Sequence, residues 1–303
     1  MTTATRRQLG LLVLLTLVWG LNWPVMKLGV SGSPAHPTPY PPLTFRALSM
    51  LGGLPLLAAG LVALKVPLAL PRAHWPLLLR LAVPNMMIWH AVAIVAVQQL
   101  SSGRAAILGY SMPIFAALWG GLLYRERLGL RQAFGVAAAG LGIVLLLANE
   151  FGKLSGSPLA AFAMIFAACV WAYGTHRLRR AALPVPLLTI VFWMTALTAL
   201  LMVILAVLLE RDRWQAPPPP VAWAIVYNAV GVFAFAQAVW LYLARSMPPV
   251  ASSISVMMIP VLGTFSGALL LGEALHWQDF AAMGLMVAAI AAVLIKPGAG
   301  TDR

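Results

Sequence analysis

The sequence has few charged residues, and acidic residues are the scarcest of them. Only 9% of its 303 residues are Asp, Glu, Lys or Arg, whereas an average soluble domain has about 25%. The charges are also unbalanced, with 20 Lys and Arg against 7 Asp and Glu. A soluble nucleic-acid-binding domain would share this balance but would need far more polar surface. The composition excludes a soluble enzyme and a disordered basic tail, and it favours a polytopic membrane protein.

Cysteine is almost absent, since Cys169 is the only one in the chain. An internal disulfide and a cysteine-based metal site are therefore both excluded. A cleavable signal peptide is not expected either, although Arg6 and Arg7 precede an apolar stretch at 9–26. That stretch is too long for the apolar part of a signal peptide and lacks a small-residue cleavage site. We interpret it as the first transmembrane helix.

Long apolar runs, in contrast, fill the chain, and 62% of its residues are apolar. A transmembrane helix needs about 20 mainly apolar residues, because the hydrocarbon core of a bilayer is about 30 Å thick. Short separators rich in proline, glycine or charge divide the chain into ten such windows. They are 9–30, 42–64, 75–99, 104–124, 130–149, 158–177, 186–209, 220–243, 250–271 and 277–295. We therefore predict an all-α polytopic membrane protein with ten transmembrane helices.

The Lys and Arg residues segregate between the two sides of these ten helices. With a cytoplasmic N-terminus, fourteen of them lie on the cytoplasmic side and five on the outer side, while Arg46 falls inside a span. Because Lys and Arg are retained in cytoplasmic loops, this distribution predicts that both termini are cytoplasmic. It also supports the count of ten, since nine or eleven helices would break the segregation.

The second half of the chain repeats the first at a spacing of 147 residues. The pairs with the most distinctive residues are Pro113 with Pro260, Gly120 with Gly267, and Glu126 with Glu273. Five helices per repeat is an odd number, so the second repeat (150–303) is expected to be inverted relative to the first (1–149). Inverted repeats are typical of transporters that work by alternating access, with a substrate site near the midplane. The alternative is a duplicated scaffold without a transport function.

Several short motifs resemble one family of membrane transporters. They are Trp19-Gly-Leu-Asn-Trp-Pro in the first helix, Phe45-Arg46 in the second, and Pro113 and Pro260 followed thirteen residues later by Glu126 and Glu273. With ten helices in two repeats, the chain resembles the EamA-type exporters of the drug/metabolite transporter superfamily. Within that superfamily it is most similar to the YddG-type exporters of aromatic and other neutral amino acids. The resemblance implies a central cavity walled mainly by the third, fourth, eighth and ninth helices, in an inner (plasma) membrane.

Polar side chains near the centres of the third and eighth helices are the first candidates for this cavity. Asn85, Trp89 and His90 lie in the third helix, and Gln237 is the repeat partner of His90 in the eighth. Polar groups in a membrane are costly and normally face an interior cavity. The alternative is that they form hydrogen bonds that only tie helices together. No Asp or Glu lies at the centre of a span, which favours facilitated export over proton antiport, with His90 as the one candidate proton carrier.

Aromatic residues near the membrane centre are the second set of candidates. Trp19 and Trp171 occupy corresponding positions in the first and sixth helices. An aromatic surface with a few polar groups suits an amphipathic ligand, and a tryptophan ring also attracts a cationic amine. The alternative is that these side chains only pack or anchor the helices. The remaining cavity candidates are Asn22, Tyr110, Ser252 and Ser255, although a serine often bonds its own helix backbone instead.

Prolines and one arginine suggest how the cavity opens. A proline inside a helix removes a backbone hydrogen bond and bends the helix, so we expect hinges at Pro24, Pro113 and Pro260. Arg46 has Trp193 as its repeat partner, and we expect these two residues to lie at a vestibule or gate. The alternative for Arg46 is that its side chain extends to the membrane interface.

Taken together, the sequence predicts an alternating-access exporter of small amphipathic metabolites, with aromatic and other neutral amino acids as the first choice. An exporter of lipophilic cations with the same fold is the alternative. An intramembrane enzyme is disfavoured, because no pair of acids or cluster of histidines shares a span centre, and no catalytic residue is assigned. No cofactor, metal or nucleic acid is expected. The expected partners are a small-molecule substrate and the lipid bilayer, and a monomer is compatible with the sequence.

Overall fold

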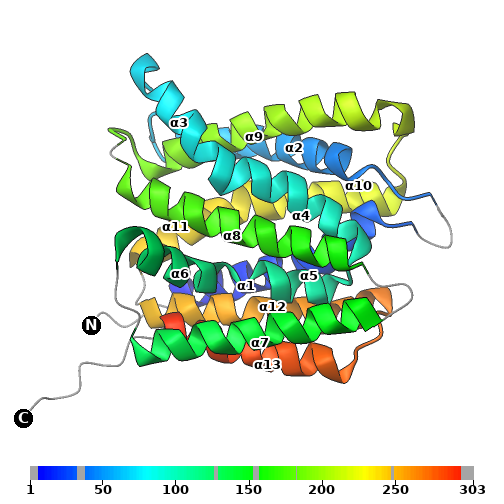
Figure 1. Cartoon of the computed structure of the whole chain (residues 1–303). Coiled ribbons are helices and arrows are strands. Elements are labelled where there is room, and N and C mark those ends of the chain that lie inside the picture. Colours follow the sequence, from blue (N-terminus) through cyan, green and yellow to red (C-terminus); the bar gives the residue numbers. More distant parts are fainter. Residues whose placement is uncertain are drawn as a thin grey trace, which may run out of the picture.

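The computed structural model describes residues 6–32, 38–125, 129–152, 157–181, 183–246 and 249–294. These residues form helices and connecting segments without a β-strand (Figure 1). The helices of the first half are α1 (Arg6–Val30), α2 (Pro42–Ala63), η1 (Arg72–His74), α3 (Trp75–Ala82), η2 (Val83–Met87), α4 (Ile88–Gln99), α5 (Ser102–Gly109), α6 (Met112–Tyr124) and α7 (Leu130–Gly152). Those of the second half are α8 (Pro158–Arg180), α9 (Leu187–Glu210), η3 (Arg211–Arg213), α10 (Pro219–Val226), η4 (Tyr227–Ala236), α11 (Gln237–Ser246), α12 (Pro249–Leu271) and α13 (Trp277–Leu294).

The helices have the length and composition of membrane spans. Within the described part of the chain, 8 helical segments are long and apolar enough to cross a membrane, and shorter apolar helices cover Met257–Leu271 and Trp277–Ala292. Each of the ten apolar windows predicted from the sequence coincides with one of these segments. Large apolar side chains, such as Leu130 and Leu269, remain exposed on the surface, where lipid would surround them. The chain is therefore a polytopic, all-helical membrane protein.

The third and eighth apolar segments each contain a π-helix. In the third segment, η2 separates α3 from α4, and in the eighth, η4 separates α10 from α11. The five residues of η2 correspond, 147 positions later, to 230–234, which lie inside η4. A π-helix is rare and is frequent at functional sites. The two interruptions therefore mark corresponding places in the two halves of the chain.

The fourth apolar segment is broken where the ninth is continuous. Helix α5 ends at Gly109, and α6 begins at Met112 with Pro113 in its first turn. Because proline has no backbone N–H, Pro113 cannot continue the hydrogen-bond ladder of α5. Pro24 and Pro260, in contrast, lie inside the uninterrupted helices α1 and α12. The three prolines expected to be hinges therefore have different backbone surroundings.

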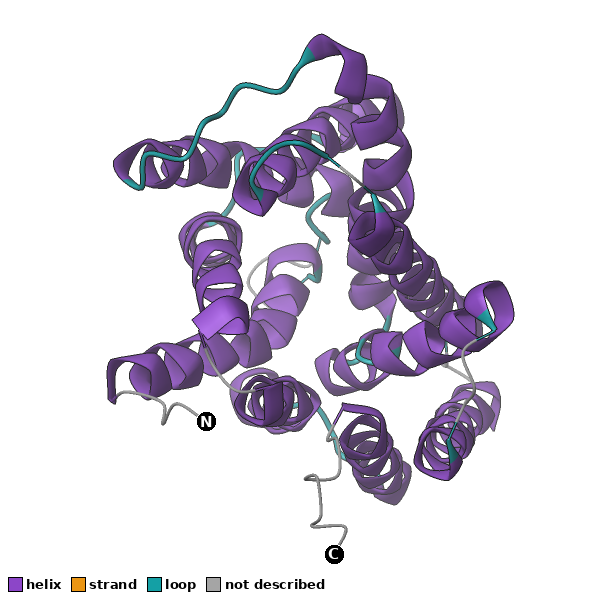
Figure 2. Ribbon diagram, turned by 90° about the vertical axis from the view of Figure 1, so that its left-hand side faces the viewer, coloured by secondary structure: helices purple, strands orange, loops and turns teal. Residues whose placement is uncertain are grey.

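The packing of α5 differs from the packing of α6. The main contacts of the bundle join α7 to α13, α1 to α12, α2 to α9 and η4, and α4 to α8. Figure 2 views many of these helices along their axes. Helix α5 packs against α12, α8 and α1, whereas α6 packs against α8, α13 and α7. After its break the fourth apolar segment thus keeps its contact with α8 but replaces its main contacts with α12 and α1 by contacts with α7.

Carboxylates cap helix N-termini at one end of the bundle, which we call the capped end. Glu210, the last residue of α9, accepts hydrogen bonds from the amides of Leu43 at 3.0 Å and Thr44 at 2.7 Å, at the start of α2. Glu273, just after α12, accepts the amide of Ser102 at 2.9 Å, at the start of α5. These bonds satisfy amides that have no partner within their own helix. They join elements from both halves of the chain.

A buried ion pair strengthens the capped end. Arg104 in the first turn of α5 donates from Nε to Oδ1 of Asp279 in α13 at 2.7 Å, and both side chains are buried. Gly267 in α12 lies so close to Ser102 and Glu273 that a Cβ at this position would overlap their side chains. The close approach of α5 and α12 therefore requires glycine at 267.

Candidate functional site

An aromatic cluster forms where α1 meets the break between α5 and α6. Trp23 of α1 is 4% exposed, and Tyr110 meets it edge-on with ring centroids 6.2 Å apart. A Cβ at Gly109 would lie 2.7 Å from the Trp23 ring and 3.2 Å from the Trp89 ring. Of the aromatic candidates, the structure therefore brings Tyr110 and Trp89 together around Trp23, which the sequence analysis did not select.

Asn22 precedes Trp23 on α1 and has an unsatisfied side-chain oxygen. Its side chain is buried, and its Oδ1 atom has no hydrogen-bond partner among the described residues. A buried polar atom without a partner costs about 1–3 kcal/mol. Such an atom in a native protein requires an explanation, and a ligand that donates a hydrogen bond is one.

Asn85, in contrast, is fully engaged in joining two helices. Its Nδ2 donates to Oγ1 of Thr175 in α8 at 3.0 Å. Gly174 allows this contact, because a Cβ there would lie 2.6 Å from the backbone nitrogen of Asn85. The structure thus shows for Asn85 the interhelical bond that the sequence analysis kept as an alternative.

His90 and Gln237 occupy corresponding positions in the two halves of the chain. His90 is the third residue after η2, and Gln237 is the first residue after η4. His90 is buried, with its ring centroid 5.5 Å from that of Phe233. Gln237 is half-buried. No hydrogen bond joins the two side chains in the structure, and their place in a substrate cavity stays a prediction.

The two tryptophans matched between the first and sixth segments have different surroundings. Trp19 packs against Trp240 of α11, with ring centroids 5.5 Å apart, among apolar residues that include Leu15 and Leu243. Trp171 is half-buried in α8. The side chains of Ser252 and Ser255 lie outside the described residues.

Arg46 and Trp193 lie at opposite ends of the antiparallel pair α2 and α9. Arg46 is in the first turns of α2, near the capped end, and is 3% exposed. Trp193 is near the start of α9, where its indole donates to the carbonyl of Leu68 at 2.7 Å and meets Trp75 edge-on at 4.9 Å. The burial of Arg46 differs from the extension to the interface considered for it, because protein encloses the side chain.

The guanidinium of Arg46 contacts α1 and η4. Its Nη2 lies 2.8 Å from Sδ of Met26, its Nη1 lies 3.5 Å from Oδ1 of Asn228, and Nε has no partner. The group also lies over the ring of Phe233 at 5.7 Å. Sequence reasoning missed Asn228, since its repeat partner is the apolar Leu81 and the search favoured polar residues matched between the halves.

Acidic side chains are confined to helix ends in the described part of the chain. The four that are described are Glu210, Asp212, Glu273 and Asp279, which lie at the ends of α9, η3, α12 and α13. Among the described residues, no three His, Cys, Asp or Glu side chains come together to hold a metal ion. The interior is therefore aromatic and amide-rich, with Arg46 as a buried cation.

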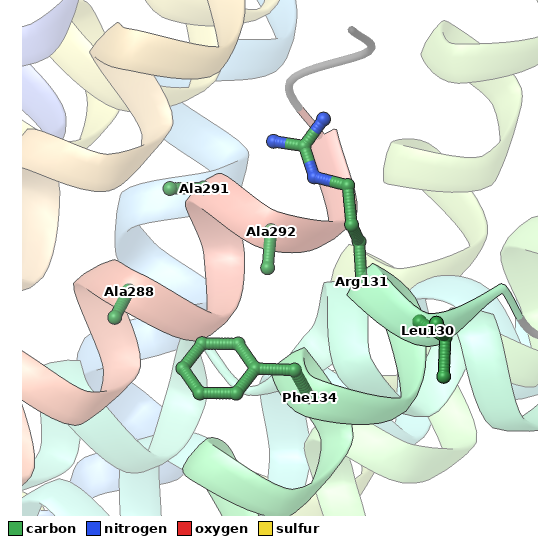
Figure 3. A pocket seen from close by; sticks show the side chains of 6 residues that line it. All are labelled: Leu130, Arg131, Phe134, Ala288, Ala291 and Ala292. Carbon is green, nitrogen blue, oxygen red and sulfur yellow. The ribbon is translucent and has the colours of Figure 1, made fainter.

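A separate surface pocket lies between α7 and α13 and has a volume of about 530 Å³ (Figure 3). It is lined by Leu130, Arg131, Phe134, Ala288, Ala291 and Ala292. None of the candidate residues lines it. Its mostly apolar wall faces outward from two peripheral helices and offers few groups for specific recognition.

Comparison with known proteins identifies relatives along nearly the whole chain. The protein named uncharacterized inner membrane transporter YedA, from Escherichia coli strain K12, is 29% identical over 301 residues, covering 94% of this chain and 90% of that protein. A probable amino-acid metabolite efflux pump from Salmonella typhimurium is 24% identical and covers 94% of both chains. An uncharacterized transporter, YvbV, from Bacillus subtilis is 24% identical over 300 residues.

A solved structure and a family match agree with this relationship. One solved crystal structure superposes on this chain with a TM-score of 0.65 and a sequence identity of 23%. The match covers 93% of this chain and 96% of the other. At this identity it supports the fold alone. Residues 7–148 and 158–295 each match the EamA-like transporter family. Because the two matches together cover almost the entire described chain, the protein belongs to the EamA-like transporter family.

Proposed function

We propose that the chain exports small amphipathic metabolites, with aromatic and other neutral amino acids as its substrates, across the inner membrane. The observation that carries this proposal is the cluster of Trp23, Tyr110 and Trp89, together with the unsatisfied Oδ1 of Asn22, the residue that precedes Trp23 on α1. Aromatic faces would hold an apolar side chain, and the amide oxygen would accept a hydrogen bond from an ammonium group. The relatives named as amino-acid metabolite efflux pumps agree with this substrate class.

The mechanism we propose is alternating access between two inverted five-helix repeats, residues 1–149 and 150–303. The family matches each half of the chain separately, and the π-helices occupy corresponding positions in the two halves. Both observations support a duplicated architecture. Transporters with inverted repeats bind their substrate between the repeats and expose it to one side at a time.

In this mechanism the structure represents a state closed at the capped end. There, α5 contacts α12 directly, and the amide of Ser102 is bound by Glu273. At the other end α6 packs mainly against α8, with further contacts to α13 and α7, and α12 is not among its main partners. The distribution of Lys and Arg predicts that the capped end faces outward, which would leave the open side toward the cytoplasm, where an exporter loads.

We further propose that export is driven by the substrate gradient. The described acidic side chains lie at helix ends, so proton coupling at the membrane centre would depend on His90. The rival function is export of lipophilic cations, which the aromatic cluster would also accept through cation–π attraction. The buried charge of Arg46 opposes a cation in the same region, and this favours amino acids.

Transport into proteoliposomes tests both the substrate class and the energy source. The purified chain would be reconstituted and supplied with labelled phenylalanine, tryptophan, leucine and a lipophilic cation, with and without imposed pH and voltage gradients. We expect amino-acid flux that follows the concentration gradient and is insensitive to pH. Movement of the lipophilic cation without any amino acid would contradict the proposal, and flux that requires a pH gradient would contradict its uncoupled form.

A further inference from the structure

The guanidinium of Arg46 is a permanent charge enclosed within the membrane-embedded bundle. Arg46 is 3% exposed and sits between α1, α2 and η4. A guanidinium stays protonated in proteins. Burying a charge in a membrane protein is costly unless the charge is paired or hydrogen-bonded, and such residues normally mark a functional site.

The contacts of Arg46 do not satisfy this charge. Of its five N–H donors, one meets the sulfur of Met26, which is a weak acceptor, and another has only the long 3.5 Å contact with Asn228. Nε has no acceptor, and Phe233 adds a cation–π contact from one side. No carboxylate of the described residues forms an ion pair with it.

Arg104 is a second buried arginine of this protein, and it has an acidic partner. Arg104 is 5% exposed, and its Nε donates to Asp279 at 2.7 Å. Glu210 caps the N-terminus of α2, the helix that carries Arg46, but its carboxylate already binds the amides of Leu43 and Thr44 and the hydroxyl of Thr44. Arg46 therefore lacks the anionic partner that Arg104 has.

A second unsatisfied group lies on α1, one helical turn before Met26, which contacts Arg46. Asn22, whose Oδ1 has no partner, precedes Met26 by four residues on α1. Residues four apart share one face of a helix and are about 6 Å apart along its axis. The face of α1 whose Met26 contacts Arg46 therefore also carries a buried hydrogen-bond acceptor without a partner, one helical turn away.

We propose that the Arg46 guanidinium binds the carboxylate of the transported substrate, with Asn22 accepting from its ammonium group. This inference rests on the proposed function and specifies its ligand, because it selects compounds with a free carboxylate over amides and simple cations. Binding displaces Met26 from Nη2 and supplies Nε and Nη2 with the two oxygens of one carboxylate, a bidentate arrangement that guanidinium groups favour.

Binding measurements on the full-length protein in detergent test this assignment. The probes are phenylpropionate, which has only the carboxylate, L-phenylalanine, which has both charges, and L-phenylalaninamide, which has only the ammonium. Arg46→Gln is expected to weaken binding of phenylpropionate and phenylalanine on the order of 10- to 100-fold, as expected for loss of a charge-assisted hydrogen bond. Binding of phenylalaninamide is expected to stay unchanged or to strengthen.

Lys27→Gln is the matched control, since it removes from the same end of α1 a cation whose Nζ donates to the carbonyl of Gln98 and interacts with the carboxylate of Glu273. We expect it to leave the preference for carboxylates intact. Arg46→Lys keeps the charge but not the planar fork, and we expect it to retain that preference with weaker binding. This second variant tests the site even if Arg46→Gln does not fold.

Several outcomes would overturn the inference. One is equal weakening of all three probes by Arg46→Gln in a folded protein, and another is a folded Arg46→Lys variant without preference for phenylpropionate. Displacement of phenylpropionate by chloride at equal concentration would assign the site to inorganic anions instead. If the wild-type protein binds phenylpropionate through Arg46 but transports no amino acid, the carboxylate site stands and the proposed function fails.

Discussion

Buried polar side chains in this protein fall into two groups with opposite expected effects on stability. Asn85 and Arg104 have well-placed partners, so they join helices and stabilise the fold. Asn22 and Arg46 have unsatisfied atoms, so their burial lowers the stability of the folded protein. A residue that costs stability and yet is placed in the interior is best explained by a ligand that completes its bonds.

This distinction gives a prediction for the two asparagines. Asn22→Leu removes an unsatisfied amide, so we expect the melting temperature in detergent to stay the same or rise, while amino-acid transport falls several-fold. Asn85→Leu is the matched control, because it breaks the bond to Thr175 and leaves that hydroxyl without its donor, at a cost of about 1 kcal/mol or more. A melting temperature that falls equally in both variants would show that Asn22 has a structural role.

At the level of residues, the sequence predicted polar and aromatic chemistry near the centre but not its pairing. Tyr110 and Trp89 were selected, whereas Trp23, which joins them, was not, because an apolar tryptophan in an apolar helix has no pattern that separates packing from binding. Asn228 was missed since its repeat partner is Leu81. Symmetry between halves therefore finds matched residues and overlooks those, like Arg46 and Asn228, that make the two halves different.

Helices at the capped end depend on carboxylates supplied by other helices. Each cap places a negative charge at a helix N-terminus, where the helix dipole favours it. The cap on α5 also requires the close approach of α12, because a Cβ at Gly267 would overlap Ser102 and Glu273. The cap on α5 and the contact between the two halves are therefore a single structural feature.

Gly267→Ala tests this dependence. The added methyl group is expected to separate α12 from α5 and to break the Ser102–Glu273 bond, which would lower stability by about 1–3 kcal/mol, as overpacking does. Thermal unfolding in detergent measures the change. Gly140→Ala is the control, because nothing lies within 4 Å of a Cβ at that exposed position of α7 and alanine favours a helix. Equal stability of both variants would contradict the close-approach argument.

The element boundaries show where sequence reasoning succeeds. Each of the ten apolar windows overlaps helices of the described part of the chain, because hydrophobicity over about 20 residues decides whether a segment is buried in lipid. The π-helices were not predicted, since the change from one hydrogen-bond register to another depends on tertiary packing and leaves no periodic signal. Pro113 predicted a bend in the fourth segment, and the structure has a full break there. Pro260 shows that the same residue at the matched position is accommodated within one helix.

For the whole molecule, alternating access requires that the capped end open during each cycle. Cysteines introduced at Ser102 and Glu273, in a Cys169→Ser background, would face one another where α5 meets the end of α12, because the two native side chains are hydrogen-bonded. We expect oxidation of this pair to abolish transport and reduction to restore it, as measured by flux into proteoliposomes. The reduced double variant is the control for the substitutions themselves. Undiminished flux through the cross-linked protein would contradict alternating access at this end.

The break between α5 and α6 has a consequence for the energetics of such a cycle. The positions that match Tyr110 and Ser111 are Met257 and Met258, which lie within the continuous helix α12. If the two halves exchange conformations, α12 breaks at these methionines while α5 and α6 join into one rod. The number of broken helical turns then stays constant, so breaking the helix adds no net free energy to the exchange, and the ligand needs to supply only the other differences between the two states.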